Sequence, residues 1–286
     1  MKRGTMPAKT ENSAPVWLMC LALITIGLGP ATAFALDPMG PPLAEVEKGQ
    51  FRAGLDYSFS DMDIELGEAK FDQYVNGVLQ GSGDGPSVTF EGFKPHKGYA
   101  SVGYGIFNNW EAFLRLGAAT ANSGGNVWDL GEEFDGSIDF AVGGGIKATF
   151  YEGFYTTIGG LAQVNYTRYD GNLSGSDWSA PDFVEIDLAE LQVALGVTYM
   201  WTPRLSVYAG PFAYFAVGNF EGSFSTTADD ITGLIRTDYS RDIDEGPTFG
   251  GYVGARIKIT EDRFFNIEYQ QTADAGAVGA GLMFRF

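Results

Sequence analysis

Apolar and polar residues alternate with a period of two over most of the chain between residues 48 and 286. In the first such segment the apolar positions are Phe51, Ala53, Leu55, Tyr57 and Phe59, with polar or small residues between them. Because successive side chains of a strand point to opposite faces, this pattern predicts a strand with one apolar and one polar face. The segments are about 9 to 13 residues long, which is the length that a tilted strand needs to cross a bilayer.

Ten segments of this kind are expected, over residues 50–59, 99–106, 110–117, 138–150, 156–166, 184–201, 205–215, 249–259, 265–269 and 278–286. Eight strands would result if the short ninth segment and one neighbour were omitted, and twelve would require a further hairpin between Asp61 and Lys97. In the sixth segment the apolar phase changes between Leu188 and Leu191, which predicts a β-bulge near Ala189.

The connections between these segments alternate in length. Short turns follow the second, fourth, sixth and eighth segments, whereas long polar stretches follow the first, third, fifth and seventh, over residues 61–97, 121–136, 168–182 and 217–247. Short turns at one end and long loops at the other are typical of a bacterial outer-membrane barrel with both termini in the periplasm and long loops outside the cell. The sequence therefore predicts an all-β, antiparallel, up-and-down transmembrane β-barrel of ten strands.

The two faces of the predicted strands carry different chemistry. Aromatic residues at the strand ends of the apolar face are expected at the two membrane interfaces, namely Trp110, Trp201, Tyr57, Phe59, Phe284 and Phe286. Charged residues of the polar face are expected to line the lumen, namely Arg52, Asp56, Glu111, Arg115, Asp139, Lys147, Arg256, Lys258 and Glu268. An apolar barrel interior could not bury such charges. They suit either a salt-bridged filling or a narrow water path.

Residues 1–35 have the pattern of a secretory leader. Basic residues precede an apolar run of about 13 residues, short of the roughly 20 that span a bilayer. The small-x-small sequence Ala33-Phe34-Ala35 predicts cleavage after Ala35, which would also remove the single cysteine, Cys20. Residues 36–47 are then expected to form a short periplasmic segment, and residues 48–286 the barrel.

The charge balance restricts the partners and ligands. A formal net charge of -18 disfavours nucleic acid, because phosphates would be repelled. One cysteine and one histidine cannot supply a four-ligand zinc site, and no cofactor is expected. The weak candidates for a divalent cation are the carboxylates of Asp61, Asp63, Glu65, Asp242, Asp244 and Glu245, although a solvated acidic face is the simpler interpretation. Such cations could also bridge these acids to lipopolysaccharide phosphates.

The C-terminal sequence Gly281-Leu282-Met283-Phe284-Arg285-Phe286 resembles the terminal strand of outer-membrane barrels, which ends in Phe. With the leader and the alternation, the chain resembles small barrels of the OmpA-like and opacity-type group. The resemblance implies that the barrel assembly machinery reads the C-terminal strand and that outer-membrane lipid and lipopolysaccharide surround the barrel. The group includes adhesins, structural barrels, small pores and a few enzymes, so it does not specify an activity.

Two enzyme classes of similar architecture do not match. Omptin proteases require an Asp two residues before a His, but the only histidine, His96, has Lys94 at that position. Barrel phospholipases and deacylases need a His–Ser pair, and nothing marks Ser101, near His96 in sequence, as a nucleophile. The lysine-flanked His96 is therefore expected to be a solvated loop residue, and catalytic residues are not expected.

The sequence favours a non-enzymatic outer-membrane barrel that displays long acidic extracellular loops for surface interaction or envelope integrity. A narrow, cation-preferring, porin-like channel is the alternative, and an outer-membrane hydrolase is a weaker one. Trp128 and Trp178, in two of the long polar stretches, are candidates for contact with a surface partner that the sequence does not identify.

Overall fold

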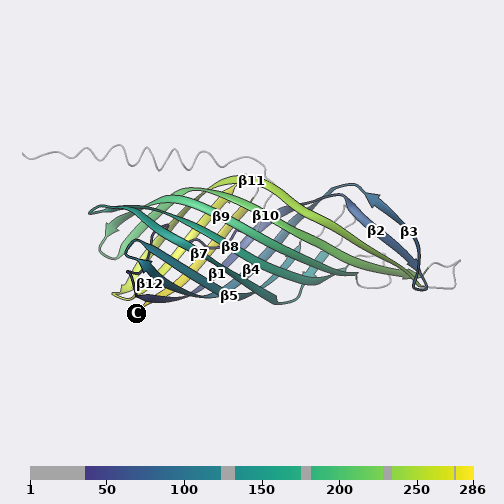
Figure 1. Ribbon diagram of the computed structural model, residues 1–286, viewed down its shortest axis with the longest axis horizontal. Helices are drawn as coiled ribbons and strands as arrows, with labels where there is room; N and C mark the ends of the chain where they lie inside the picture. The colour runs from purple at the N-terminus through teal and green to yellow at the C-terminus, as the bar shows by residue number, and fades with distance from the viewer. Residues whose placement is uncertain (1–35, 124–132, 175–181, 228–233, 274) are drawn as a thin grey trace, which may run out of the picture.

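The computed structural model describes residues 36–123, 133–174, 182–227, 234–273 and 275–286. These residues form an elongated all-β molecule (Figure 1). The strands are β1 (Phe51–Leu66), β2 (Ala69–Val75), β3 (Val78–Gly85), β4 (Val88–Phe107), β5 (Trp110–Ser123), β6 (Glu133–Gly136), β7 (Asp139–Glu152), β8 (Thr156–Ser174), β9 (Asp182–Thr202), β10 (Leu205–Thr227), β11 (Leu234–Thr260), β12 (Arg263–Thr272) and β13 (Ala275–Arg285). The described part contains no helix long and apolar enough to cross a membrane.

Ten of the described strands close into a ring. Going around it, β1 is followed by β4, β5, β7, β8, β9, β10, β11, β12 and β13, and each strand is antiparallel to its neighbours. The ring closes where β13 pairs with β1, with Arg52 opposite Arg285. This arrangement confirms the predicted ten-stranded, antiparallel, up-and-down barrel.

The two ends of the barrel differ. At the turn end, which carries the C-terminus, tight connections such as Asn108–Asn109 join neighbouring strands. At the opposite, extended end, the expected long loops are largely strand: β10 continues to Thr227 and pairs with β11 up to Leu234. The polar stretches were predicted as loops because their outward residues are hydrophilic, but their inward residues alternate with them and are apolar.

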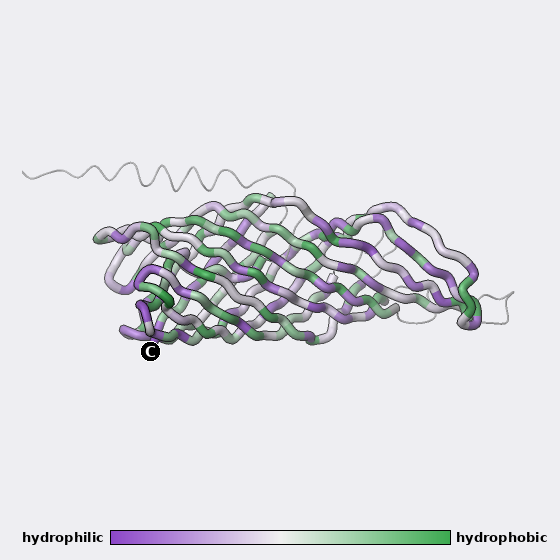
Figure 2. The backbone as a smooth tube through the Cα atoms, viewed as in Figure 1, coloured by the Kyte–Doolittle hydropathy of each residue, from purple (hydrophilic) through white to green (hydrophobic). Residues whose placement is uncertain are grey.

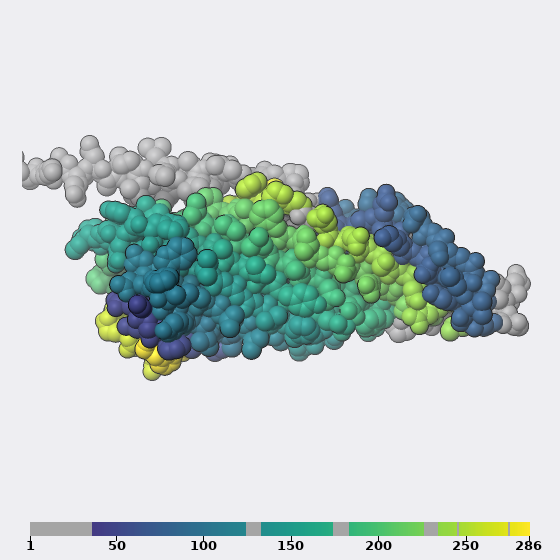
Figure 3. All heavy atoms as spheres, viewed as in Figure 1, coloured from purple at the N-terminus to yellow at the C-terminus, as the bar shows by residue number. Residues whose placement is uncertain are grey.

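A hairpin made of β2 and β3 lies at the extended end. It falls between Asp61 and Lys97, where the twelve-stranded alternative would require a further hairpin. Its turn is Asn76-Gly77, both with positive φ, as a two-residue hairpin turn requires. Strand β2 pairs with the far half of β11, from Ile235 to Ser240, so the hairpin extends the sheet without entering the ring. Figure 3 shows the blue hairpin against the yellow-green end of β11.

The outer surface around the turn-end half is apolar. Leu55, Val102, Leu114, Leu195 and Val253 are all more than half exposed there, which would be unfavourable in water but suits a lipid environment. Outward aromatic side chains border this band on both sides, with Trp110, Trp201, Phe284 and Phe286 toward the turn end and Tyr57 and Phe59 toward the extended end. The chain is therefore a transmembrane β-barrel of the outer-membrane type.

The polarity of the two faces reverses along single strands. In β9 the inward residues Val184, Ile186 and Leu188 are fully buried and apolar, whereas the next inward residues, Glu190 and Gln192, are polar. The register of β9 with β8 and β10 is continuous through this region, so there is no bulge near Ala189. The predicted bulge was wrong because the apolar residues change face while the backbone alternation continues. Figure 2 shows green and purple alternating along the strands, with more purple at the extended end.

Candidate functional site

The lumen of the membrane-spanning half is lined by buried charged and amide side chains. Most of the predicted lumen residues point into it: Arg52, Glu111, Arg115, Lys147, Arg256 and Glu268 are buried, and Asp56 is partly buried. Arg52 donates a hydrogen bond from Nε to Glu111 Oε1 at 2.5 Å. These groups were identified from the strand alternation alone.

The other two predicted lumen residues lie at the rims. Asp139 is partly exposed near the extended end, where Arg168 Nε lies 3.6 Å from its Oδ2. Lys258 is partly exposed at the turn end and pairs with the exposed Glu261. Neither residue joins the buried charge network, because each lies where its strand reaches solvent.

The segment from Leu36 to Lys48 runs through the lumen, and we call it the N-terminal plug. Leu36, Asp37, Met39, Glu45 and Val46 are all buried. The sequence analysis placed residues 36–47 in the periplasm, outside the barrel. The structure differs because the plug supplies acidic groups and carbonyls to buried lumen side chains such as Lys97, Arg115 and Lys147.

The plug is held at two levels by ion pairs. Near its start, Asp37 Oδ2 lies 3.3 Å from Lys97 Nζ and 3.7 Å from Arg115 Nη2. Nearer the turn end, Glu45 lies 3.3 Å from Lys147 Nζ and pairs with Arg256.

Hydrogen bonds to the plug backbone reinforce these pairs. Arg115 donates to Pro38 O at 3.2 Å, Lys147 donates to Pro41 O at 3.2 Å, and Gln270 donates to Asp37 O at 2.8 Å. The plug therefore connects several strands of the wall from inside.

Buried polar side chains also join opposite walls directly. Lys97 on β4 pairs with Glu190 on β9 at 2.5 Å, and Tyr214 on β10 donates to the same carboxylate at 2.7 Å. Gln192 on β9 donates to Gln270 on β12 at 3.2 Å. Strands β4 and β9, and likewise β9 and β12, are not neighbours in the ring, so the side chains of these two pairs cross the lumen to meet.

An aromatic layer closes the barrel beyond these polar groups. Phe90 on β4 and Phe220 on β10 lie on opposite walls, yet their ring centroids are 6.1 Å apart. Phe93 packs against Phe134 at 6.0 Å and against Tyr169 at 5.2 Å. All five side chains are almost fully buried, so this layer is an apolar core.

The single histidine faces outward from the wall. His96 lies within β4, not in a loop as expected, and its Nδ1 is 2.7 Å from Tyr57 Oη. Its ring centroid is 4.8 Å from that of Phe59. Ser101, considered as its partner, is buried on the inner side of the barrel, so the wall separates the two side chains. His96 belongs to the aromatic border nearer the extended end.

The carboxylates considered for a divalent cation lie on the outer face of the extended end. Asp61 and Glu65 are exposed on β1, and Asp63 accepts a hydrogen bond from Gly92 N at 2.7 Å. Asp242 and Asp244 are exposed on β11, and the side chain of Glu245 lies outside the described residues. Within the described ranges, no three such side chains come together as a metal site.

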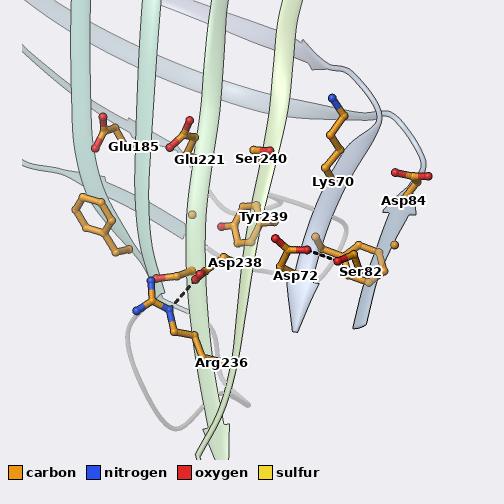
Figure 4. Close-up of a pocket in the computed structure, with 15 residues that line it drawn as sticks. Lys70, Asp72, Ser82, Asp84, Glu185, Glu221, Arg236, Asp238, Tyr239 and Ser240 are labelled. Atoms are coloured by element: carbon orange, nitrogen blue, oxygen red, sulfur yellow. Dashed lines mark hydrogen bonds and ion pairs between the residues drawn. The ribbon is translucent and has the colours of Figure 1, made fainter. Parts of the chain in front are cut away.

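A cleft of about 830 Å³ lies on the extended end, between the β2–β3 hairpin and the far halves of β9, β10 and β11 (Figure 4). Five carboxylates line it together with only two basic side chains: Asp72, Asp84, Glu185, Glu221 and Asp238, with Lys70 and Arg236. Arg236 donates to Asp238 at 2.7 Å, and Ser82 donates to Asp72 at 2.5 Å. The exposed aromatic ring of Phe183 also contributes to the lining.

Like charges stand opposite each other in this cleft. Glu185 pairs in register with Glu221 on one side and with Asp170 on the other. Burial raises the pKa of Glu185, and the nearby carboxylates raise it further, while Arg168, 2.5 Å away, opposes them. Opposed like charges on neighbouring strands are destabilising, and Arg168 offsets this repulsion at Glu185 and Asp170.

Several residues of the lumen network were not identified from the sequence. Lys97 was assigned to a loop, although Phe93, Lys97 and Tyr99 continue the inward alternation of β4. Glu190 was hidden by the change of apolar phase in β9. No periodic signal marks Asp37 and Glu45, since the plug is not a strand.

Trp128 and Trp178, the proposed contact residues, lie outside the described residues, as do the leader and its cleavage site.

Comparison with known proteins gives no sequence relative. No family model matches the chain, and no curated protein matches it. Among solved structures, it is similar to the outer membrane protease OmpT of Escherichia coli, with 11% identity, coverage of 85% of this chain and 99% of that one, and a TM-score of 0.44. It is also similar to an outer membrane channel from Pseudomonas putida F1, with 13% identity, coverage of 88% of this chain and 100% of that one, and a TM-score of 0.42. A third similar structure is the translocator domain of the autotransporter NalP from Neisseria meningitidis. Its identity is 14%, the match covers 85% of this chain and 91% of that one, and the TM-score is 0.40.

Proposed function

We propose that this protein is a closed, non-enzymatic outer-membrane barrel that displays a rigid acidic surface outside the cell for interaction or envelope integrity. The observation that carries the proposal is the filled lumen. Phe90 and Phe220 approach each other from opposite walls, and the N-terminal plug fills the polar half below them. A barrel filled in this way supports a surface, whereas a pore needs a continuous water path.

The extension beyond the apolar band supports the display role. Its strands continue well past the outward aromatic residues and enclose their own buried core, as with Ile186 and Phe220. We propose that this end is extracellular and the turn end periplasmic, because short turns face the periplasm in outer-membrane barrels. Its outer carboxylates, including Asp61 and Asp242, would then lie near the lipopolysaccharide layer, where divalent cations could bridge them to phosphates.

The channel alternative is less well supported. A cation-preferring path would need water past the aromatic layer, and two of the predicted lumen charges, Arg115 and Lys147, instead bind the plug. The hydrolase alternative rested on His96, which contacts Tyr57 and Phe59 on the outer wall, away from Ser101.

Planar-bilayer conductance of the purified protein tests the proposal. We expect no stable openings for the wild type or for Arg115→Ala, since the aromatic layer remains in both. The matched positive control removes residues 36–47 and combines this deletion with Phe90→Ala and Phe220→Ala.

This control variant should conduct and prefer anions, because the deletion removes Asp37 and Glu45 while the lumen cations remain. Stable, cation-selective steps from the wild type would instead contradict the closed barrel and favour the pore.

A further inference from the structure

We propose that strand β3 is a docking edge for an extended, positively charged polypeptide segment, which would add to the sheet as a further strand. The proposal names the partner for the surface role and so rests on the proposed function. Strand β3 ends the sheet: it pairs with β2, and within the described residues no strand pairs with its other side. Alternate N–H and C=O groups along this side point away from β2, where an added strand can pair with them.

The regular part of the edge runs from Gly81 to Gly85. A register shift interrupts the pairing of β3 with β2 near the turn, between Gln73 and Tyr74, and beyond it the pairing is continuous. The edge contains no Pro or Lys, which commonly block such additions. Five regular residues provide a length of about 17 Å, enough for a short strand to pair.

The two faces beside the edge specify the partner's side chains. On the outer face lies the acidic cleft, with Asp84 on β3 itself and Glu221 further across the sheet (Figure 4). On the other face, Gly81, Gly83 and Gly85 alternate, and the Phe71 ring lies over Gly83. Because side chains of an added strand would alternate between these faces, the partner should alternate cationic and apolar residues.

Charge decides between a foreign segment and a second copy of this chain. The chain carries a formal charge of -18, and pairing two β3 edges would bring their acidic clefts together. A cationic segment instead supplies positive charge to Asp84 on β3 and Asp72 on β2, the cleft carboxylates nearest the edge. Charge complementarity of this kind favours association and partner choice.

The test uses the purified protein in detergent micelles and a synthetic octapeptide of alternating Lys and Val. We expect saturable binding by fluorescence anisotropy, with slower amide hydrogen exchange at residues 81–85. The same peptide with alternate backbone amides methylated has equal charge but cannot complete the strand pairing, so it should bind at least tenfold more weakly. A Glu–Val octapeptide should not bind.

Protein variants separate charge from fold. Asp84→Lys should weaken binding of the Lys–Val peptide severalfold, whereas Asp262→Lys, the same change at the turn end, should not. Equal binding of the methylated peptide, or binding without protection of residues 81–85, would overturn the docking edge.

Protection of residues 81–85 without peptide would overturn it too: concentration-dependent protection would assign the edge to a second copy, and constant protection to this chain's own residues. If the barrel does not conduct and the peptide does not bind, the proposed partner is wrong but the proposed closed barrel still stands.

Discussion

Lys97 is one of the buried cations that tie the plug to the wall. It lies within 3.3 Å of Asp37 and 2.5 Å of Glu190, on the plug and on a non-neighbouring strand. Breaking a buried pair leaves uncompensated charge, which costs far more than losing an exposed pair. The contribution of each ion pair in this protein therefore depends on its depth.

We expect Lys97→Ala to lower the free energy of unfolding by about 3–5 kcal/mol, because the buried Glu190 loses its paired cation and Asp37 keeps, among the described residues, only Arg115. Lys258→Ala is the matched control: it removes a pair with the exposed Glu261 and should cost less than about 1 kcal/mol. Urea unfolding monitored by tryptophan fluorescence measures both. If both variants lost the same free energy of unfolding, the burial of an ion pair would not determine its contribution to stability.

Glu221→Gln should lower the pKa of Glu185. Burial is the main cause of the raised pKa of Glu185, and Glu221 adds to it across the strand pair. Since the folded state binds this proton more tightly than the unfolded state, Glu185 makes the wild type lose stability as pH rises from the ordinary glutamate pKa toward the raised one. Glu221→Gln should reduce that loss.

Titration of Glu185 by carboxyl-selective NMR measures the shift. Glu261→Gln, at the opposite end, should leave the pKa of Glu185 unchanged. If the pKa of Glu185 did not change in Glu221→Gln, repulsion between Glu221 and Glu185 would be excluded as a cause of the raised pKa.

At the scale of elements, alternation found every strand of the ring, but it did not find their ends. Strand ends were set where outward residues became polar, although inward residues beyond those ends, such as Phe93 on β4, Phe220 on β10 and Ile243 on β11, are apolar and buried. A periodicity signal is the same for both faces, so it cannot show which one is inside. In the embedded half the outer face contacts lipid, whereas in the extended end it contacts water. This change depends on where the membrane lies and not on the alternation of the sequence.

The β2–β3 hairpin did have a local signal. Val75-Asn76-Gly77-Val78 is the Asn-Gly pair, flanked by apolar residues, that favours a two-residue turn. The plug had no comparable signal, because its position depends on Lys97, Arg115 and Lys147, which are distant in sequence. Elements defined by local turns can be predicted, whereas a segment defined by distant charges requires the assembled barrel.

Gly77→Val should destabilise this hairpin by roughly 1–3 kcal/mol, since a β-branched residue is strained at positive φ. Gly77 has φ 79°, whereas Gly246 has open space around its Cα and no positive φ, so Gly246→Val is the control. Hydrogen exchange of residues 69–85 should accelerate in Gly77→Val alone. Unchanged exchange there would mean that β11, not the turn, holds the hairpin.

At the scale of the whole molecule, the orientation can be tested with single cysteines. The only cysteine, Cys20, lies in the expected leader, so introduced thiols would be unique in the mature protein. Ser82→Cys on β3 should react with a membrane-impermeant maleimide on intact cells, and Asn108→Cys in a short turn should react only after lysis. The reverse pattern would place the turn end outside.

The contacts across the lumen have a mechanical consequence. A hollow tube under sideways load becomes oval, because nothing inside resists the approach or separation of its walls. Here Lys97 and Glu190, Gln192 and Gln270, and the Phe90 and Phe220 rings act as internal braces between distant strands. Flattening the barrel would compress these contacts, and widening it would break them. We therefore expect a sideways load on the extended end to reach the embedded half with little change in the cross-section of the barrel.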